Sequence, residues 1–174
     1  GALTFDSAPL EEDMEILGAA VAELELEVDR PVAMICVRLS DVQPEGPITR
    51  VTYGLLNLTH RGSHQHPEPL EPGRRYRIAV AMNDVAQRFP KGHCIRLALS
   101  TVYWPLAWPA PEPVRMILHT GSSALRLPVR PPREEDERMR PFEAPETAGP
   151  IERQQLTPVE HRWKVTHDLA NGRD

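Results

Sequence analysis

Three histidines and a glutamate in one short segment have the types and the spacing that could bind a metal ion. His60, His64 and His66 form an H-x-x-x-H-x-H pattern, and Glu71 follows. Three imidazoles and one carboxylate would suit zinc, iron or manganese. The alternative is a solvated loop in which the histidines are polar surface groups.

The part of this cluster from His64 to Glu71 partly resembles the first metal motif of the cupins. A metal-dependent cupin-like enzyme is therefore one alternative function. Two features count against it: the glycines that the motif needs are absent, and three prolines within residues 67–72 interrupt the strand that would aim the ligands. We favour the solvated loop and predict no metal and no cofactor.

A second group is the segment Y-W-P-L-A-W-P at residues 103–109. Its two tryptophans could plug the end of a scaffold or a domain interface, because indole is amphipathic and usually well buried. Alternatively, Tyr103, Trp104 and Trp108 could form one wall of a substrate pocket, since loops at one end of a rigid scaffold often carry binding residues. We name these three residues as substrate-pocket or domain-interface candidates.

Recognised hydrolytic motifs are absent from the sequence. It contains no G-x-S-x-G, no G-x-x-x-x-G-K and no H-E-x-x-H. Ser100 and the pair Ser122-Ser123 do not sit on a strand-turn-helix elbow, and no buried carboxylate is evident beside them or His119. We therefore assign no catalytic residue to this chain.

The scaffold that positions these residues is expected to consist of strands. Within residues 22–28, apolar residues alternate with glutamates, which is typical of a half-buried strand, although the composition of residues 11–27 also suits a helix. Residues 32–39 are apolar on both faces and predict a central strand. Further strands are expected at 48–58, 76–82, 95–99, 114–118, 125–129 and 162–169.

Roughly eight short strands, separated by turn signals, predict an all-β antiparallel sandwich, in particular a jelly roll. Residues 83–89 are the one segment expected to form a helical turn. Of the 19 prolines, eleven lie between Pro105 and Pro158. We therefore expect a jelly-roll domain at 1–130, a charged Pro-rich linker at 131–150 and, at 151–174, a truncated extension with one strand.

Charge narrows the classes of possible partner, and cysteine content indicates the cellular compartment. The net charge is −5 without a basic stripe, which argues against nucleic acid and anionic membranes. Cys36 and Cys94 lie in apolar runs, as buried free thiols do in a reducing compartment, and a disulfide requires their strands to lie opposite each other. We predict a cytoplasmic location and leave a homodimer open. The sequence starts without Met, so we expect a fragment.

Three segments together resemble a known domain. L-T-F-D-S-A-P-L at residues 3–10, followed by an acidic and apolar stretch ending at Gly18, resembles the opening of the C-terminal non-catalytic domain of X-Pro dipeptidyl-peptidases and cocaine esterase/NonD hydrolases. Residues 32–42, which end L-S-D-V, and F-P-K-G-H-C-I-R-L at residues 89–97 are similar to the next elements of that family. The similarity extends over about residues 2–130.

The resemblance implies a galactose-binding-domain-like jelly roll that follows an α/β-hydrolase domain with a Ser-His-Asp triad. No triad position of the family falls in this sequence. The chain would cap and shape the active site of that upstream domain of the same polypeptide. The intact protein would be a bacterial serine hydrolase, an acyl esterase or X-Pro dipeptidyl-peptidase-like enzyme acting on a small ester or amide, and this chain alone would be inactive.

A carbohydrate-binding module is the other alternative function, because galactose-binding-like folds often bind sugars and the two tryptophans could be sugar platforms. The aromatic share of 5% counts against it. Arg38 and Arg96 are interpreted as outward-facing residues on a sheet or as partners for carboxylates across a domain interface. Asp41 is interpreted as a turn residue or as such a partner.

Overall fold

Alternating burial along the strands separates an interior face from an outer face. Strand β3 (Val21–Val28) buries every second residue, from Ala22 to Val28, and leaves the glutamates between them partly exposed. The computed structural model describes residues 1–152, 154 and 160–166, and these contain strands and short 3-10 turns but no α-helix. The strand interpretation of residues 22–28 is thus confirmed, and the helical alternative is wrong.

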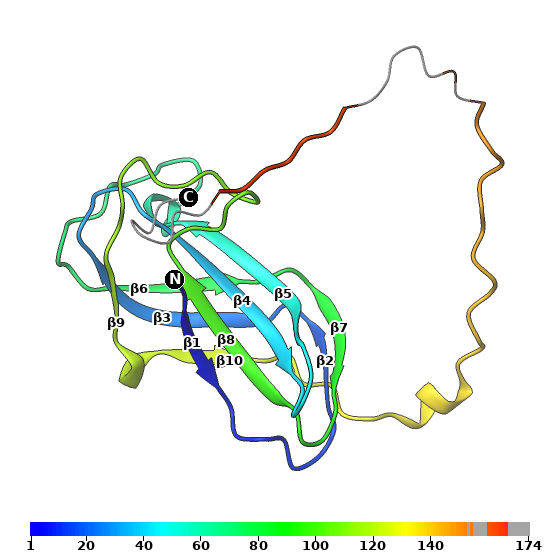
Figure 1. Cartoon of the computed structure of the whole chain (residues 1–174). Coiled ribbons are helices and arrows are strands. Elements are labelled where there is room, and N and C mark those ends of the chain that lie inside the picture. The colour runs from blue at the N-terminus through cyan, green and yellow to red at the C-terminus, as the bar shows by residue number, and fades with distance from the viewer. Residues whose placement is uncertain (153, 155–159, 167–174) are drawn as a thin grey trace. The chain divides into compact units, whose positions relative to one another are not determined.

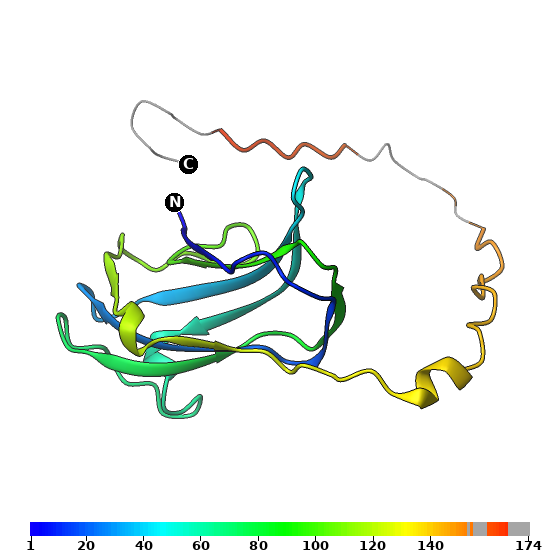
Figure 2. The ribbon, with the colours of Figure 1, turned by 90° about the horizontal axis from the view of Figure 1, so that it is seen from below.

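Two antiparallel sheets lie face to face (Figures 1 and 2). The first has the strand order β1 (Leu3–Asp6), β8 (Cys94–Ser100), β4 (Met34–Val42), β5 (Ile48–Asn57). The second has the order β10 (Ala124–Arg126), β3, β6 (Tyr76–Ala81), and β9 (Met116–Leu118) also pairs with β3. A separate pair consists of β2 (Met14–Gly18) and β7 (Val85–Phe89). The predicted all-β antiparallel sandwich is confirmed, and its jelly-roll and galactose-binding-like assignment stays a prediction.

The hydrophobic core lies between the two sheets. Strand β4, with β8 on one side and β5 on the other, is buried over most of its length, as its apolar sequence on both faces predicts. Core side chains without solvent contact also come from the second sheet, from the β2–β7 pair and from the 3-10 turn η1 (Leu58–His60). The largest of these side chains are Phe89, Ile16, Leu26, Ile35, Leu39 and Leu58.

The helical turn predicted at residues 83–89 is wrong. Residues 85–89 form strand β7, which pairs antiparallel with β2 from Val85 opposite Gly18 to Phe89 opposite Met14. Burial alternates along β7 and ends on the fully buried Phe89. Pairing with β2 and burial of Phe89 therefore decide the conformation of this segment.

The segment after the sandwich has little regular structure in its described part. The chain divides into two compact units, Gly1–Glu137 and Arg138–Asp174. The 3-10 turn η3 (Glu134–Arg138) lies where a linker is expected, and η2 (Thr120–Ser122) belongs to the sandwich. The strand predicted at 162–169 is absent from residues 162–166, which have no ladder partner, and residues 167–169 lie outside the described residues.

The two cysteines are free. The register pairs Cys36 with Ser100 and Cys94 with Val42, so they occupy distant rungs of the β4–β8 ladder. Cys36 is buried, which raises the pKa of its thiol and leaves it unreactive, whereas Cys94 is partly exposed.

In the described residues, no helix has the length and hydropathy needed to cross a membrane.

An ion pair holds the edge strand β1 in the first sheet. Arg96 of β8 donates from Nε and Nη2 to the two carboxylate oxygens of Asp6 at 2.6 and 2.7 Å, and the two residues are partners in the register. Because these hydrogen bonds favour the charged carboxylate, they hold the pKa of Asp6 below its ordinary value.

We expect an Asp6→Asn variant to be less stable than the wild type near neutral pH and the difference to vanish in strong acid. A carboxyl with a lowered folded-state pKa contributes stability that is complete above about pH 3.9 and is lost as the pH falls through the folded-state value. Urea unfolding at about pH 7 and about pH 2 measures this. Asp84→Asn, at an exposed aspartate of the same domain, is the control. An Asp6→Asn effect that is equally large at both pH values contradicts the argument.

Candidate functional site

The aromatic loop at residues 103–109 follows β8 and leaves both of its indoles in solvent. The Ala107 N–H donates to the Tyr103 carbonyl at 2.9 Å and closes the loop. Trp104 is 48% exposed and Trp108 is 80% exposed. Their rings meet edge to face, with 5.1 Å between centroids. Such exposure shows that neither indole plugs the end of the sandwich within this chain, so a pocket wall and a domain interface remain the two interpretations.

Tyr103 has a different environment, because it anchors the loop to the first sheet. Its ring meets Tyr53 of β5 edge to face at 5.6 Å between centroids. The Cζ of Arg38 lies 5.2 Å from the centroid of the Tyr103 ring, a cation–π distance. Arg50 donates from Nη1 to the Tyr103 hydroxyl. Of the three candidates, Tyr103 is thus the anchor, and Trp104 and Trp108 form the exposed tip.

A β-bulge places Arg50 on the same outer face as Arg38. The β4–β5 register runs Arg38 opposite Tyr53 and Leu39 opposite Thr52, and it then skips Val51 so that Ser40 lies opposite Arg50. Without the skipped residue, strict alternation would turn Arg50 toward the core. The bulge re-aims its side chain toward Tyr103, which is a known use of bulges.

The first sheet has a hollow on its outer face, which we call the arginine cradle. Its volume is about 540 Å³. Small side chains on three neighbouring strands leave the space, and three arginines with Tyr103 border it. The residues of the arginine cradle are Ala2, Thr4, Arg38, Ser40, Ile48, Arg50, Arg96, Ala98 and Tyr103. The geometry suits recognition of a negatively charged oxygen group.

Two sequence interpretations about charged residues of the first sheet change. Arg96 is engaged by Asp6 within the chain rather than across an interface. Asp41 lies inside β4, so it is not a turn residue. The carboxylate of Asp41 is buried and meets Nδ1 of His93 at 2.8 Å. Arg38 therefore has neither of these carboxylates as a partner.

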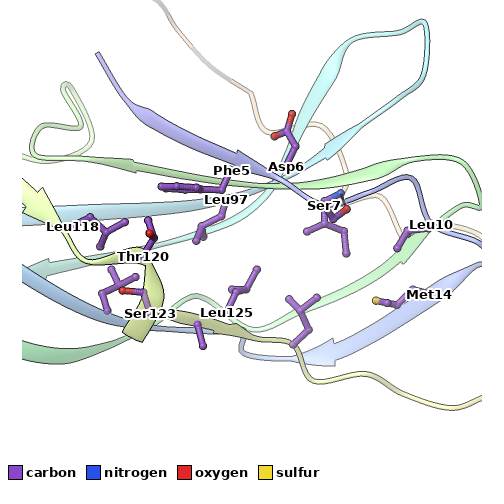
Figure 3. Close-up of a pocket in the computed structure, with 14 residues that line it drawn as sticks. Phe5, Asp6, Ser7, Leu10, Met14, Leu97, Leu118, Thr120, Ser123 and Leu125 are labelled. Carbon is purple, nitrogen blue, oxygen red and sulfur yellow. Dashed lines mark hydrogen bonds between the residues drawn. The ribbon is translucent and has the colours of Figure 1, made fainter.

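A second cavity lies between the two sheets, where their edges are open (Figure 3). Its volume is about 460 Å³, and its lining is mostly aliphatic. In Figure 3, Phe5 and Leu97 lie on one side, Leu125 lies opposite them, and Leu118 lies at the left end of the cavity. The sequence did not indicate this cavity, because six different strands and the loops beside them bring its residues together.

Two serines at this cavity have their hydroxyls engaged by the backbone. Ser7 Oγ donates to the Ala8 carbonyl and accepts from the Ile95 N–H at 2.7 and 2.9 Å. Ser123 Oγ donates to the His119 carbonyl at 2.8 Å and accepts from the Glu25 N–H at 3.1 Å. Among the described residues, neither hydroxyl has the base partner that a nucleophile needs. The cavity can accept an apolar group, and these serines are structural.

The histidine segment does not converge on one point. The rings of His60 and His64 lie 5.5 Å apart between centroids. Glu71 is engaged by Arg74, whose Nη1 donates to it at 2.6 Å. Within the described part of the chain, no group of three or more His, Cys, Asp or Glu side chains is placed to hold a metal ion.

Comparison with known proteins identifies the family. The family model of the X-Pro dipeptidyl-peptidase C-terminal non-catalytic domain matches residues 1–140. The chain belongs to this family. The resemblance inferred from the three sequence segments is thereby confirmed, and the family description agrees with the absence of a catalytic motif in the sequence.

Relatives of this family member are much longer than the chain. Mb1866c of Mycobacterium bovis, which carries a serine esterase name, is 29% identical over 115 residues, covering 56% of this chain and 18% of its own length. The Mycobacterium tuberculosis protein MT1883, with the same kind of name, has the same identity and coverage. The chain thus spans less than a fifth of the curated relatives that it matches.

Solved structures share the fold. An alpha-amino acid ester hydrolase superposes with a TM-score of 0.69 at 22% identity, covering 74% of this chain and 25% of that one. An aminopeptidase from a Thaumarchaeota archaeon gives 0.68 at 18% identity, with 75% and 26% covered. A CocE/NonD family hydrolase from Staphylococcus aureus gives 0.63 at 13% identity, with 74% and 30% covered. In each case the sandwich corresponds to a part of a larger chain.

Proposed function

We propose that this chain is the C-terminal domain of a larger serine hydrolase and that it caps the active site of an upstream catalytic domain. The observation that carries the proposal is the aromatic loop. Trp104 and Trp108 are exposed at the tip of a loop whose base, Tyr103, is fixed by two arginines. Exposed indoles on a rigid support are typical of surfaces that another protein surface or a ligand covers.

The substrate class of the proposed parent follows from the names of its relatives. One relative has a serine esterase name, and two of the solved structures are an alpha-amino acid ester hydrolase and an aminopeptidase. All three names describe hydrolysis at an ester or amide carbonyl. When a serine hydrolase carries out such a reaction, its serine nucleophile forms an acyl-enzyme. The role proposed for this chain is to exclude water and to border the acyl or leaving group of a small ester or amide. In this proposal the serine nucleophile belongs to the upstream domain.

The intact protein in this proposal is cytoplasmic. The two free cysteines support this location, because free thiols persist in a reducing compartment. A homodimer stays a prediction.

Labelling with a fluorophosphonate probe tests the proposal. The probe reacts with activated serine nucleophiles, so we expect it to label the intact gene product and not the 174-residue chain. Labelling of the chain itself would reveal a nucleophile among its own serines. If neither protein is labelled, the serine-hydrolase assignment fails.

In the intact protein, we expect Trp104→Ala to change the ratio of kcat/KM between a bulky and a small acyl substrate by about tenfold, because one wall of a pocket is removed. Stability should fall by no more than about 1.5 kcal/mol, because the side chain is 48% exposed in the chain and the edge-to-face pair with Trp108 is lost. Steady-state kinetics on both substrates measures the ratio. Trp163→Ala, at a tryptophan that is 75% exposed outside the sandwich, is the matched control. Loss of stability with an unchanged ratio would remove Trp104 from the pocket.

A further inference from the structure

The arginine cradle concentrates positive charge on a chain that is negative overall. The net charge of the chain is −5, yet three guanidinium groups border this one hollow. Arg96 is neutralised by Asp6. Among the described residues, no carboxylate lies within 4 Å of the nitrogens of Arg38 or Arg50. Two of the three positive charges thus lack a counter-charge in the part of the chain that the structure describes.

These two charges are crowded around one ring. The Cζ atoms of Arg38 and Arg50 lie 5.2 and 5.9 Å from the centroid of the Tyr103 ring. Two positive charges that lie beside the same ring repel each other, and the repulsion is stronger next to protein than in bulk water. The Nε of Arg38 is buried and has no hydrogen-bond partner. An anion between the two arginines would relieve the repulsion.

The hydrogen-bonding pattern in the arginine cradle favours an oxygen anion. The Tyr103 hydroxyl accepts from Arg50, so its own hydrogen is available to donate. A guanidinium matches two oxygens of one carboxylate in a fork. The same sheet face already contains one such arrangement, in which Arg96 holds Asp6 through two hydrogen bonds of 2.6 and 2.7 Å.

The hollow has room for a small ligand group. Its volume of about 540 Å³ lies within the usual range for small-molecule sites. Ala98 and Ser40 form the floor of the hollow, because their short side chains rise little above the sheet. Ile48 forms an apolar part of its border. A carboxylate on a short carbon skeleton fits this combination of cationic wall, small floor and apolar border.

We propose that the arginine cradle is a carboxylate-binding site, in which Arg38 and Arg50 contact the carboxylate oxygens and the Tyr103 hydroxyl donates a hydrogen bond to one of them. The carboxylate belongs either to a free small molecule or to an acidic side chain of the proposed catalytic domain. The site itself does not depend on the proposed function, because it can be tested on this chain alone.

Titration of the isolated chain with sodium succinate, followed by NMR of the arginine Nε–H groups, tests the site. We expect saturable shifts for Arg38 and Arg50, with no comparable shifts from sodium chloride at equal ionic strength or from neutral succinamide. Affinity should fall about tenfold in Arg50→Gln. Arg50→Lys should bind less tightly than the wild type, because it keeps the charge but loses the fork.

The control variant is Arg77→Gln, at an exposed arginine of the second sheet, and it should bind as the wild type does. The absence of saturable shifts up to about 100 mM succinate would overturn the proposal. Equal affinity in Arg50→Gln and the wild type would also overturn it, because binding would then be located elsewhere.

Repeating the titration on the intact protein distinguishes the two sources of the carboxylate. Succinate binding to both the chain and the intact protein supports a free small-molecule ligand. Binding to the chain but not to the intact protein supports an acidic side chain of the catalytic domain that already fills the cradle. A failure of the fluorophosphonate test would leave the result on the isolated chain unchanged, so the two proposals fail separately.

Discussion

Phe89→Ala is expected to destabilise the sandwich by about 3–5 kcal/mol, which is the cost of removing a large aromatic side chain from a core. Phe89 has no solvent exposure and heads the set of largest fully buried side chains. It ends β7, a strand of only five residues whose ladder partner is β2. A strand pair this short has few backbone hydrogen bonds, so it depends on core contacts, and Phe89 makes these together with Ile16 of β2.

Equilibrium unfolding in urea, followed by far-UV circular dichroism of the strands, measures the loss. The matched control is Phe142→Ala, since Phe142 is 98% exposed and lies outside the sandwich unit. We expect that control to change the free energy of unfolding by less than about 0.5 kcal/mol. A loss below about 1 kcal/mol for Phe89→Ala would mean that the β2–β7 pair is not coupled to the core as the buried ring requires.

The sequence predicts a strand where its pattern of apolar and polar residues matches the burial of the strand. β3 and β6 alternate strictly, and β4 is apolar on both faces, so their burial follows from their sequences. β1 has four exposed residues and therefore no alternation of burial to detect. Its place at the edge of the sheet depends on pairing with β8 and on the ion pair of Asp6 with Arg96. Such contacts between distant segments leave no local pattern in the sequence.

The aromatic loop and the arginine cradle also differ in how far the sequence predicts them. The aromatic loop was found from the sequence because its residues are consecutive. The arginine cradle was not, because its arginines come from three strands and meet only through the register of the sheet. The bulge at Leu39/Ser40 decides on which face Arg50 emerges. A single skipped residue of this kind is not visible as a sequence pattern.

The second large effect on stability is expected at Gly54 of β5. Gly54 lies opposite Val37, on the inner face of the first sheet. A Cβ at this glycine would lie 2.4 Å from the carbonyl oxygen of Ala81 and 3.2 Å from the Cα of Met82. These are backbone atoms at the end of β6, so no rotamer change can make room. The first and second sheets therefore approach each other at a point that admits only glycine.

Gly54→Ala is accordingly expected to destabilise the chain by about 1–3 kcal/mol, as overpacking of a core does. Elsewhere a Gly→Ala change can stabilise by about 0.4–1 kcal/mol, because it reduces the conformational freedom of the unfolded chain. Gly62→Ala is the matched control, since nothing lies within 4 Å of its Cβ position. Thermal unfolding of both variants gives opposite signs if the contact with Ala81 is the cause, and equal shifts would contradict it. Because β5 also carries Arg50, Gly54→Ala should weaken succinate binding as well, by moving that arginine relative to Tyr103.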